Sequence, residues 1–200
     1  MNRQSLVQLF GDAVIPLAGV FLFEWSLYFI LLFYCLDMIA NEIIAHLKSK
    51  KIIEFNGKDK KAWVISGLKS VLLMIISLVT IHVAVYFIHA DIDFKKEFVA
   101  FMMYEELGIP QGYVLVPLIA FSSYQVYRMN FLMPAKFRSI QLEEVWRPHI
   151  QSLIVIILAA GASIGLSQLI IFPDWAYVII IVLVAFSYQF WLLYSISHKR

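Results

Sequence analysis

The sequence predicts an all-α integral membrane protein, a helical bundle of six transmembrane helices with both termini in the cytoplasm. The first observation is composition: 62% of the 200 residues are hydrophobic and 15% are charged, whereas a soluble domain has about 45–50% apolar and about 25% charged residues. The second is that the apolar residues form continuous runs, not the alternating pattern of a membrane β-barrel. The third is that lysine and arginine are gathered in a few connections. Too few polar residues remain to cover a soluble core, so the expected solvent is lipid.

A helix that crosses a bilayer needs about 20 mostly apolar residues, and six segments approach this length. They are residues 6–23, 25–44, 71–88, 113–132, 152–172 and 175–196. The first segment contains Asp12, Pro16 and Gly19, so a kinked span and a re-entrant segment shielded by protein are both open for it. No repeat or soluble region interrupts the spans, and we therefore expect a single domain over residues 1–200.

The connection between the third and fourth spans mixes apolar and acidic side chains. Residues 97–108 hold Phe98, Phe101 and Met102 between Glu97 and Glu105. A short amphipathic segment of this kind is typical of a helix that lies in the membrane interface. We expect this helix on the outer face.

The positions of lysine and arginine predict the orientation of the spans. Six lysines lie between residues 48 and 61, four basic residues lie between 128 and 147, and Lys199 and Arg200 end the sequence. In the six-span arrangement all of them fall on one side, whereas the opposite side has Lys95 and Lys96 among several acidic residues. The basic side is therefore predicted to be the cytoplasmic side of a bacterial inner membrane. The expected partners are the lipid bilayer and other membrane proteins or further copies of the chain. Nucleic acid is not expected, because the basic residues form no single large face.

Several polar side chains fall inside the predicted spans, where ionisable groups are rare and usually face the bundle interior. Asp12 and Asp37 share one depth, and Arg128 lies in the same inner half. We expect Arg128 to pair with Asp37 or Asp12, because an unpaired charge is costly there; it could instead reach the cytoplasmic headgroups. Structural bonding is favoured over a role in transport or catalysis. The intramembrane candidates are Asp12, Asp37, Asn41, Glu42, Gln125, Arg128, Tyr188 and Gln189.

The histidines raise the question of a cofactor. His82 and His89 are seven residues apart and share one helix face, and neutral imidazole is a ligand for haem iron, zinc and copper. The spacing is too long for one ion held from a single helix, and His46, His149 and His198 lie on the cytoplasmic side. We therefore expect no cofactor, with haem or a metal at His82 and His89 as the alternative.

Glu42 and His46 are four residues apart near the inner end of the second span. This spacing allows a proton-relay pair or half of a metal site, although a hydrogen bond at a helix end is the commoner outcome. His149 precedes the fifth span and His198 follows the sixth. A cytoplasmic cluster of histidines is thus a further alternative, without support from close spacing.

Two other features point to no reaction. Cys35 is the sole cysteine, which excludes an internal disulfide and a multi-cysteine metal site. Gly161, Ser163 and Gly165 match the letters of a serine-hydrolase motif, but that motif works on a strand-to-helix turn with histidine and acidic partners. Here it lies within a predicted helix. Two glycines four residues apart in a span instead predict close helix packing.

The run VIPLAGVFLFEWSLYFILLFYCLDMIANEI leads from a Pro–Gly segment to a tryptophan and then to a tyrosine in the second span. With the third-span sequence IHVAVYFIHA and the final YSISHKR, it resembles an uncharacterised bacterial membrane family, domain of unknown function 6498. Cys35 and Asp37 stand where that pattern has tryptophan and glutamate. The resemblance implies a polytopic topology and directs attention to Asp37, His82, His89 and His198, but it implies no activity. The matching residues are Pro16, Gly19, Trp25 and Tyr34.

The sequence contains no nucleotide-binding loop, no metal signature and no nucleophile with a base, so an enzyme is not the favoured expectation. The leading hypothesis is a component or scaffold of a membrane assembly. The first alternative is a proton- or ion-coupled small transporter that uses Asp12 and Asp37, with residues 16–19 as a broken helix beside the site. The second alternative is a haem- or metal-binding membrane protein that uses His82 and His89. Neither a substrate nor an oligomeric state is predicted.

Overall fold

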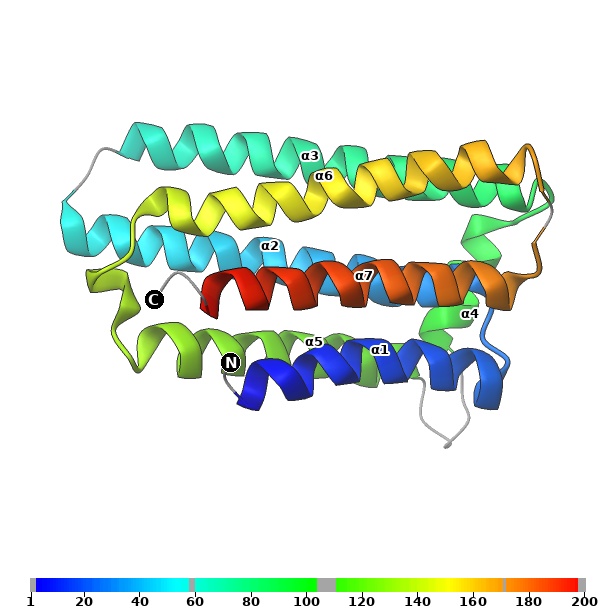
Figure 1. The fold of residues 1–200 in the computed structure, drawn as a ribbon, viewed down its shortest axis with the longest axis horizontal. Coiled ribbons are helices and arrows are strands. Elements are labelled where there is room, and N and C mark those ends of the chain that lie inside the picture. The colour runs from blue at the N-terminus through cyan, green and yellow to red at the C-terminus, as the bar shows by residue number, and fades with distance from the viewer. Residues whose placement is uncertain (1–2, 58–59, 104–110, 171, 198–200) are drawn as a thin grey trace. The chain divides into compact units, whose positions relative to one another are not determined.

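The computed structural model describes residues 3–57, 60–103, 111–170 and 172–197, and of residues 3–9, 12, 111 and 192–197 it describes the backbone only. Within these ranges the chain is helical and contains no strand, which confirms the predicted all-α class (Figure 1). The elements are α1 (Arg3–Phe23), α2 (Leu27–Asn56), α3 (Lys60–Ile88), α4 (Phe94–Met103), α5 (Gln111–Tyr127), the π-helical segment η1 (Arg128–Leu132), the 3-10 turn η2 (Lys136–Arg138), α6 (Leu142–Ser167) and α7 (Asp174–Ser197).

Four helices in the described ranges are long and apolar enough to cross a membrane. They are α2, α3, α6 and the part Asp174–Trp191 of α7, and the chain is by this measure a helical membrane protein. The 30 residues of α2 make a helix about 45 Å long, so it exceeds the roughly 30 Å of a bilayer core. In α1 the apolar stretch Ala13–Phe23 is shorter, and α5 has 17 residues. The count of six spans therefore stays a prediction.

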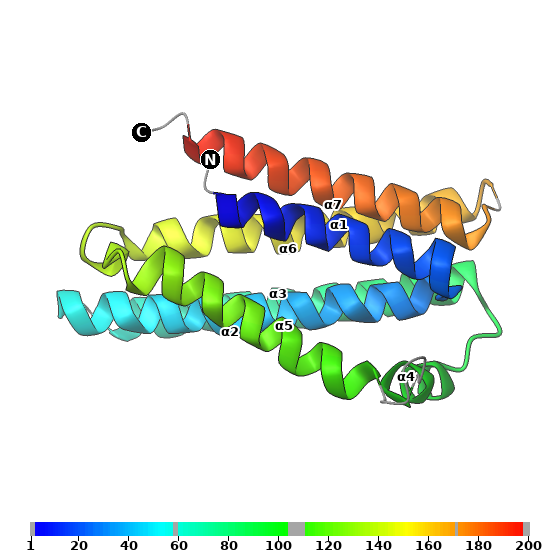
Figure 2. The ribbon, with the colours of Figure 1, turned by 90° about the horizontal axis from the view of Figure 1, so that it is seen from below.

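The chain divides into two compact units, and the first contains Met1–Leu31 and Ile170–Arg200. In it α1 and α7 lie side by side and run antiparallel, with the first turn of α1 and the last turn of α7 at the same end of the pair (Figures 1 and 2). Phe10 meets Phe186 edge to face between them, with ring centroids 5.8 Å apart. An even number of spans requires the two ends of a chain on one side, and this pairing is compatible with that requirement.

α1 is one continuous helix, and the turn from α1 into α2 explains why it ends at Phe23. Glu24 takes a left-handed backbone conformation with φ 52°, and the amide of Trp25 donates to the carbonyl of Gly19 at 2.9 Å. The left-handed residue after the last turn ends the helix. The Trp25 ring lies against Gly19, where an added Cβ would meet Trp25 Cε3 at 2.1 Å. A glycine is therefore needed at position 19.

The second unit, Leu32–Leu169, is built around the pairing of α3 with α6 (Figure 1). The buried face of α3 consists mostly of small residues, which let two helices approach closely in lipid. Ser77 donates to the carbonyl of Leu73 on its own helix at 2.8 Å and to the carbonyl of Leu153 on α6 at 3.4 Å. The buried residues of α3 are Gly67, Ser70, Ser77, Ile81, Ala84 and Val85.

A second core joins α2, the end of α5 and the start of α6. The regular helix of α5 ends at Tyr127, five residues before the predicted end of the span, and continues as the π-helical segment η1. This turn places Phe131 in the buried core, stacked on Tyr127 with ring centroids 5.5 Å apart. The buried members of this core are Ile44, Ala45, Ile52, Tyr127, Phe131, Val145 and Trp146.

Two local predictions need correction. The helix predicted at residues 97–108 is observed as α4, Phe94–Met103. It starts earlier because the Asp93 carboxylate caps it, accepting from the amides of Lys95 and Lys96 at 3.1 and 3.0 Å. Residues 104–108 lie outside the described ranges. The close packing predicted at Gly161 and Gly165 is wrong for the described residues, since nothing lies within 4 Å of a Cβ added at either.

Candidate functional site

A glutamate lies buried in the middle of the α2 core face. The buried residues of this face recur every three or four positions, as expected for one stripe of a helix, and Glu42 is 4% exposed. An ionisable side chain in a helix of membrane length is rare and must be satisfied by partners. The stripe consists of Met38, Glu42, Ala45, Ser49 and Ile52.

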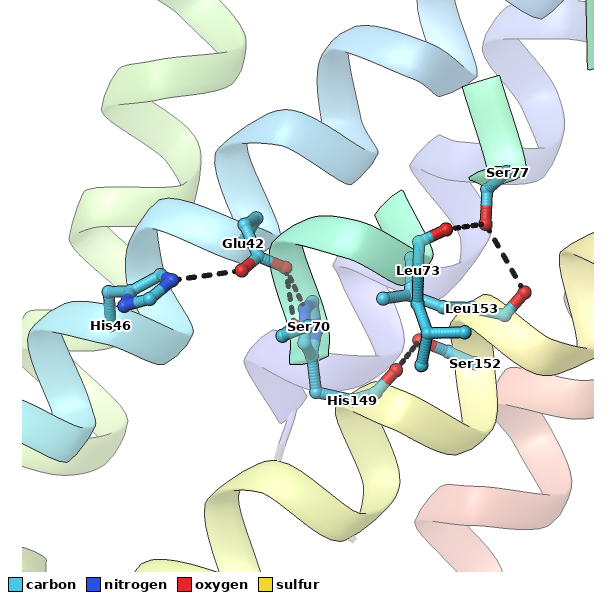
Figure 3. Close-up of polar contacts among 8 residues, drawn as sticks. All are labelled: Glu42, His46, Ser70, Leu73, Ser77, His149, Ser152 and Leu153. Atoms are coloured by element: carbon cyan, nitrogen blue, oxygen red, sulfur yellow. Dashed lines mark hydrogen bonds and ion pairs between the residues drawn. The ribbon is translucent and has the colours of Figure 1, made fainter. Parts of the chain in front are cut away.

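The Glu42 carboxylate is hydrogen bonded to side chains from three helices (Figure 3). On its own helix His46 Nε2 lies 2.9 Å from Oε1. From α3 the Ser70 hydroxyl donates to Oε2 at 2.7 Å. From α6 His149 Nε2 lies 2.6 Å from the same oxygen. All three contacts are short, and Glu42 therefore ties α2, α3 and α6 together.

Each partner is placed by the packing of its own helix. Ser70 is fully buried on the small-residue face of α3, where a larger side chain would keep α6 away. His149 lies three residues after the buried Trp146 and four before the buried Leu153. Because residues three and four apart are neighbours on a helix, it shares their face of α6. The helix start of α6 is fixed by the capping box of Gln141 and Glu144. These contacts hold both side chains toward α2.

The His46 ring is enclosed by aromatic rings and a glycine. Trp146 and Trp63 meet it edge to face, with ring centroids 5.1 and 6.5 Å away. Gly67 of α3 lies beside it, so that an added Cβ would meet His46 Cε1 at 2.7 Å and Nδ1 at 3.3 Å. Trp146 also contacts the His149 ring, at 6.2 Å. The two histidines thus share one aromatic neighbour.

The hydrogen-bond pattern defines where protons can lie. An ionised carboxylate only accepts hydrogen bonds, so with Glu42 ionised both imidazoles carry a hydrogen on Nε2, and the assignment of these tautomers follows from the contacts. If Glu42 takes a proton, one of its oxygens becomes a donor, and the facing Nε2 must become an acceptor. Glu42, His46, Ser70 and His149 form the Glu42 cluster. This cluster can gain one proton by rearranging hydrogens, with its heavy atoms in place.

Apart from Glu42, the candidates of the second unit form no cluster between helices among its described residues. Asp37 accepts from Asn41 Nδ2 at 2.9 Å, one turn along α2. Arg128 is exposed at the start of η1, and in the described part of the second unit no ion pair joins it to Asp37. Gln125 is half-buried on α5.

Three candidates belong to the first unit. Tyr188 and Gln189 are half-buried on α7, and the Tyr188 hydroxyl is buried without a hydrogen-bond partner among the described residues. The Asp12 side chain lies outside the described part of the chain. The inner polar layer thus stays a prediction.

His82 in α3 and His89 directly after it both contact the backbone of α3. His82 Nδ1 lies 2.7 Å from the carbonyl of Leu78, and its ring packs against Phe94 at 5.4 Å. His89 is placed at the end of α3, where its amide donates to Val85 at 2.7 Å. Within the described ranges no three histidine, cysteine or acidic side chains gather as a metal site. His198 lies outside them.

Sequence reasoning found half of the Glu42 cluster. The spacing of Glu42 and His46 indicated their contact, and a cytoplasmic group of histidines was named as an alternative. Ser70 was missed, although a serine three residues after a glycine on an apolar helix is a usable packing signal. The contact of His149 with Glu42 has no signal in the sequence.

Comparison of the chain with protein-family models, curated proteins and solved structures finds no match. The resemblance to domain of unknown function 6498 stays a prediction.

Proposed function

We propose that this protein is a small proton-coupled carrier of the bacterial inner membrane, with six spans and both termini in the cytoplasm, in which Glu42 binds and releases the proton. One observation carries the proposal: a 4% exposed carboxylate in a helix of membrane length is hydrogen bonded to histidines of two different helices. Chains of acidic residues and histidines inside helical bundles are the groups that pumps and transporters use to move protons.

The chemistry of the cluster favours proton binding over simple attachment of helices. Burying a charge costs several kcal/mol, and buried ionic groups can often be replaced by apolar ones without loss of stability. Serines suffice to link α3 and α6, as Ser77 shows. A carboxylate with two imidazoles adds a property that serines lack, because all three groups can exchange protons.

The depth of the cluster supports exchange with the cytoplasm. Glu42 lies near the inner end of the predicted span 25–44. Ser70 directly precedes the span 71–88, and His149 precedes the span 152–172. In the six-span arrangement these three ends face the cytoplasm, and the direct contact of Ser70 and His149 with Glu42 agrees with that arrangement.

Two expectations from the sequence are weaker explanations of this geometry. A component or scaffold of a membrane assembly needs no buried ionisable cluster. A transporter based on Asp37 would use a carboxylate whose described hydrogen bond stays within α2, so its protonation would change no contact between helices. Protonation of Glu42 changes contacts to α3 and α6 directly.

Infrared difference spectroscopy of the protein in lipid bilayers tests the proposal without a known substrate. A change from about pH 8 to about pH 3, which crosses the ordinary range of glutamate carboxyls, should produce a carboxylic acid band with a component that is missing in Glu42→Gln. Glu54→Gln is the matched control, because Glu54 is on the same helix but exposed beside Lys50 and Lys51. Its spectrum should keep that component.

Proton flux into liposomes with a trapped pH dye tests the carrier function itself. We expect a flux driven by an imposed membrane potential that is lost in Glu42→Gln and kept in Glu54→Gln and Asp37→Asn. Glu42→Asp, which keeps a carboxylate, serves if the amide variant does not fold. Persistence of the component assigned to Glu42 in a folded Glu42→Gln protein would overturn that assignment. A normal band without any flux would overturn the carrier and leave the scaffold hypothesis.

A further inference from the structure

The two oxygens of Glu42 are bonded unequally. Oε2 accepts from both Ser70, at 2.7 Å, and His149, at 2.6 Å. Oε1 has a single described partner, His46, at 2.9 Å. An oxygen that already accepts two short hydrogen bonds is the poorer site for a further proton, since one of those donors would have to turn away. The incoming proton therefore belongs on Oε1.

The two histidines also differ in access. The side chain of His46 is 31% exposed and that of His149 is 11% exposed. His46 Nδ1 has no hydrogen-bond partner among the described residues, and the edge of the ring that carries it lies beside Gly67. Because glycine has no Cβ, the His46 ring has room to lie against α3. A side chain at position 67 would displace the ring.

We propose that His46 is the residue through which Glu42 exchanges its proton, that Gly67 leaves the room the His46 ring needs for this exchange, and that His149 and Ser70 position the carboxylate. This inference rests on the proposed function, because it assumes that Glu42 is protonated and deprotonated. It assigns a direction to the cluster: one histidine exchanges and the other holds.

The step balances as a relay across one imidazole ring. A hydronium ion gives its proton to His46 Nδ1 and becomes water, and the hydrogen on Nε2 passes as a proton to Glu42 Oε1. The products are neutral His46 with its hydrogen on Nδ1 and protonated Glu42, and the cluster has gained one proton. The ionisable groups that face this step are Glu42 and His46 from α2 and His149 from α6, and α3 contributes the hydroxyl of Ser70.

Unpaired buried donors near His46 agree with a water molecule beside it. Trp63 Nε1 and Trp146 Nε1 are buried without a hydrogen-bond partner among the described residues, and both rings contact His46. Ser49 Oγ, three residues along α2 from His46, is likewise buried without a hydrogen-bond partner among the described residues. Buried donors of this kind require acceptor oxygens, and a water molecule that accepts from them can also deliver a proton to Nδ1.

Gly67→Ala tests the inference, with Gly165→Ala as the matched control. The first adds a Cβ 2.7 Å from His46 Cε1, and the second adds one where nothing lies within 4 Å. After a rapid drop in pH, the infrared carboxylic acid band of Glu42 should form about a hundredfold more slowly in Gly67→Ala, the lower end of the contribution of a positioned proton donor. It should form at the wild-type rate in Gly165→Ala and reach the same final size in both.

His46→Ala supplies a second measurement that does not depend on the folding of Gly67→Ala. The band should again form slowly, and imidazole added to the buffer should restore the rate. His149→Gln should change the final size or frequency of the band, and it should slow the formation of the band less than His46→Ala does. A wild-type rate in His46→Ala would overturn the inference while Glu42 remains the proton site. Absence of the Glu42 band in the wild type would instead overturn the proposed function.

Discussion

Ser70 and Ser77 offer a paired test of how strongly the Glu42 cluster stabilises the fold. Both serines are fully buried on the same face of α3. The hydroxyl of Ser70 donates to a carboxylate on another helix at 2.7 Å. That of Ser77 donates to the carbonyl of Leu73 on its own helix at 2.8 Å, and its contact with Leu153 on α6 is longer, at 3.4 Å. Replacing each serine with alanine removes one oxygen and leaves the helix otherwise unchanged.

The expected magnitudes follow from the acceptor. Hydrogen bonds to charged groups contribute about 1.5–3 kcal/mol in proteins, whereas hydrogen bonds between membrane helices average about 0.6 kcal/mol and reach about 1.7. The two ranges meet near 1.5 kcal/mol, which is the loss we expect for Ser70→Ala. For Ser77→Ala we expect about 0.6 kcal/mol or less, because its shorter bond is made within one helix and can also form in the unfolded chain.

Unfolding of the purified protein in mixed detergent micelles, followed by circular dichroism, measures both losses. In a Glu42→Gln background the cost of Ser70→Ala should fall, since the acceptor is then neutral, and the difference is the coupling energy between the two side chains. The cost of Ser77→Ala should not change in that background. Equal costs for the two serines, or no coupling between Ser70 and Glu42, would refute the claim that Glu42 is a charged acceptor between α2, α3 and α6.

Two further predictions concern the hairpin of α1 and α2 and the orientation of the spans. Gly19→Ala should lower the free energy of unfolding by about 1–3 kcal/mol, because its Cβ would overlap the buried Trp25 ring. Gly161→Ala, whose added Cβ meets nothing within 4 Å, should leave the free energy of unfolding equal or higher. Similar losses for the two variants would contradict the contact between Gly19 and Trp25. Alkaline phosphatase inserted after Lys50 should be inactive, and the same enzyme inserted after Lys96 should be active, because the basic connections are predicted to be cytoplasmic. Activity of the fusion after Lys50 would reject that orientation and the cytoplasmic exchange proposed for Glu42.

The sequence by itself determined the class of the protein and the contacts within single helices. Apolar length is a local property, so the helices α2, α3, α6 and α7 can be recognised by counting residues. The contact of Glu42 with His46 follows from their spacing of four, because the helix repeat brings such residues to one face. The helix at residues 94–103 was likewise expected, apart from its bounds.

The tertiary structure alone decided which helix faces meet. Ser70 and His149 are 28 and 107 residues from Glu42 in the chain, and no periodicity connects them to it. In lipid an apolar face can meet either a neighbouring helix or the hydrocarbon, so hydrophobic patterning does not select the pairs; small residues and polar contacts do. For the same reason the glycine pattern alone did not show that Gly67 is packed against His46 while Gly161 and Gly165 stand open. The Glu42 cluster exists only because the faces of α2, α3 and α6 that carry its four side chains pack against one another.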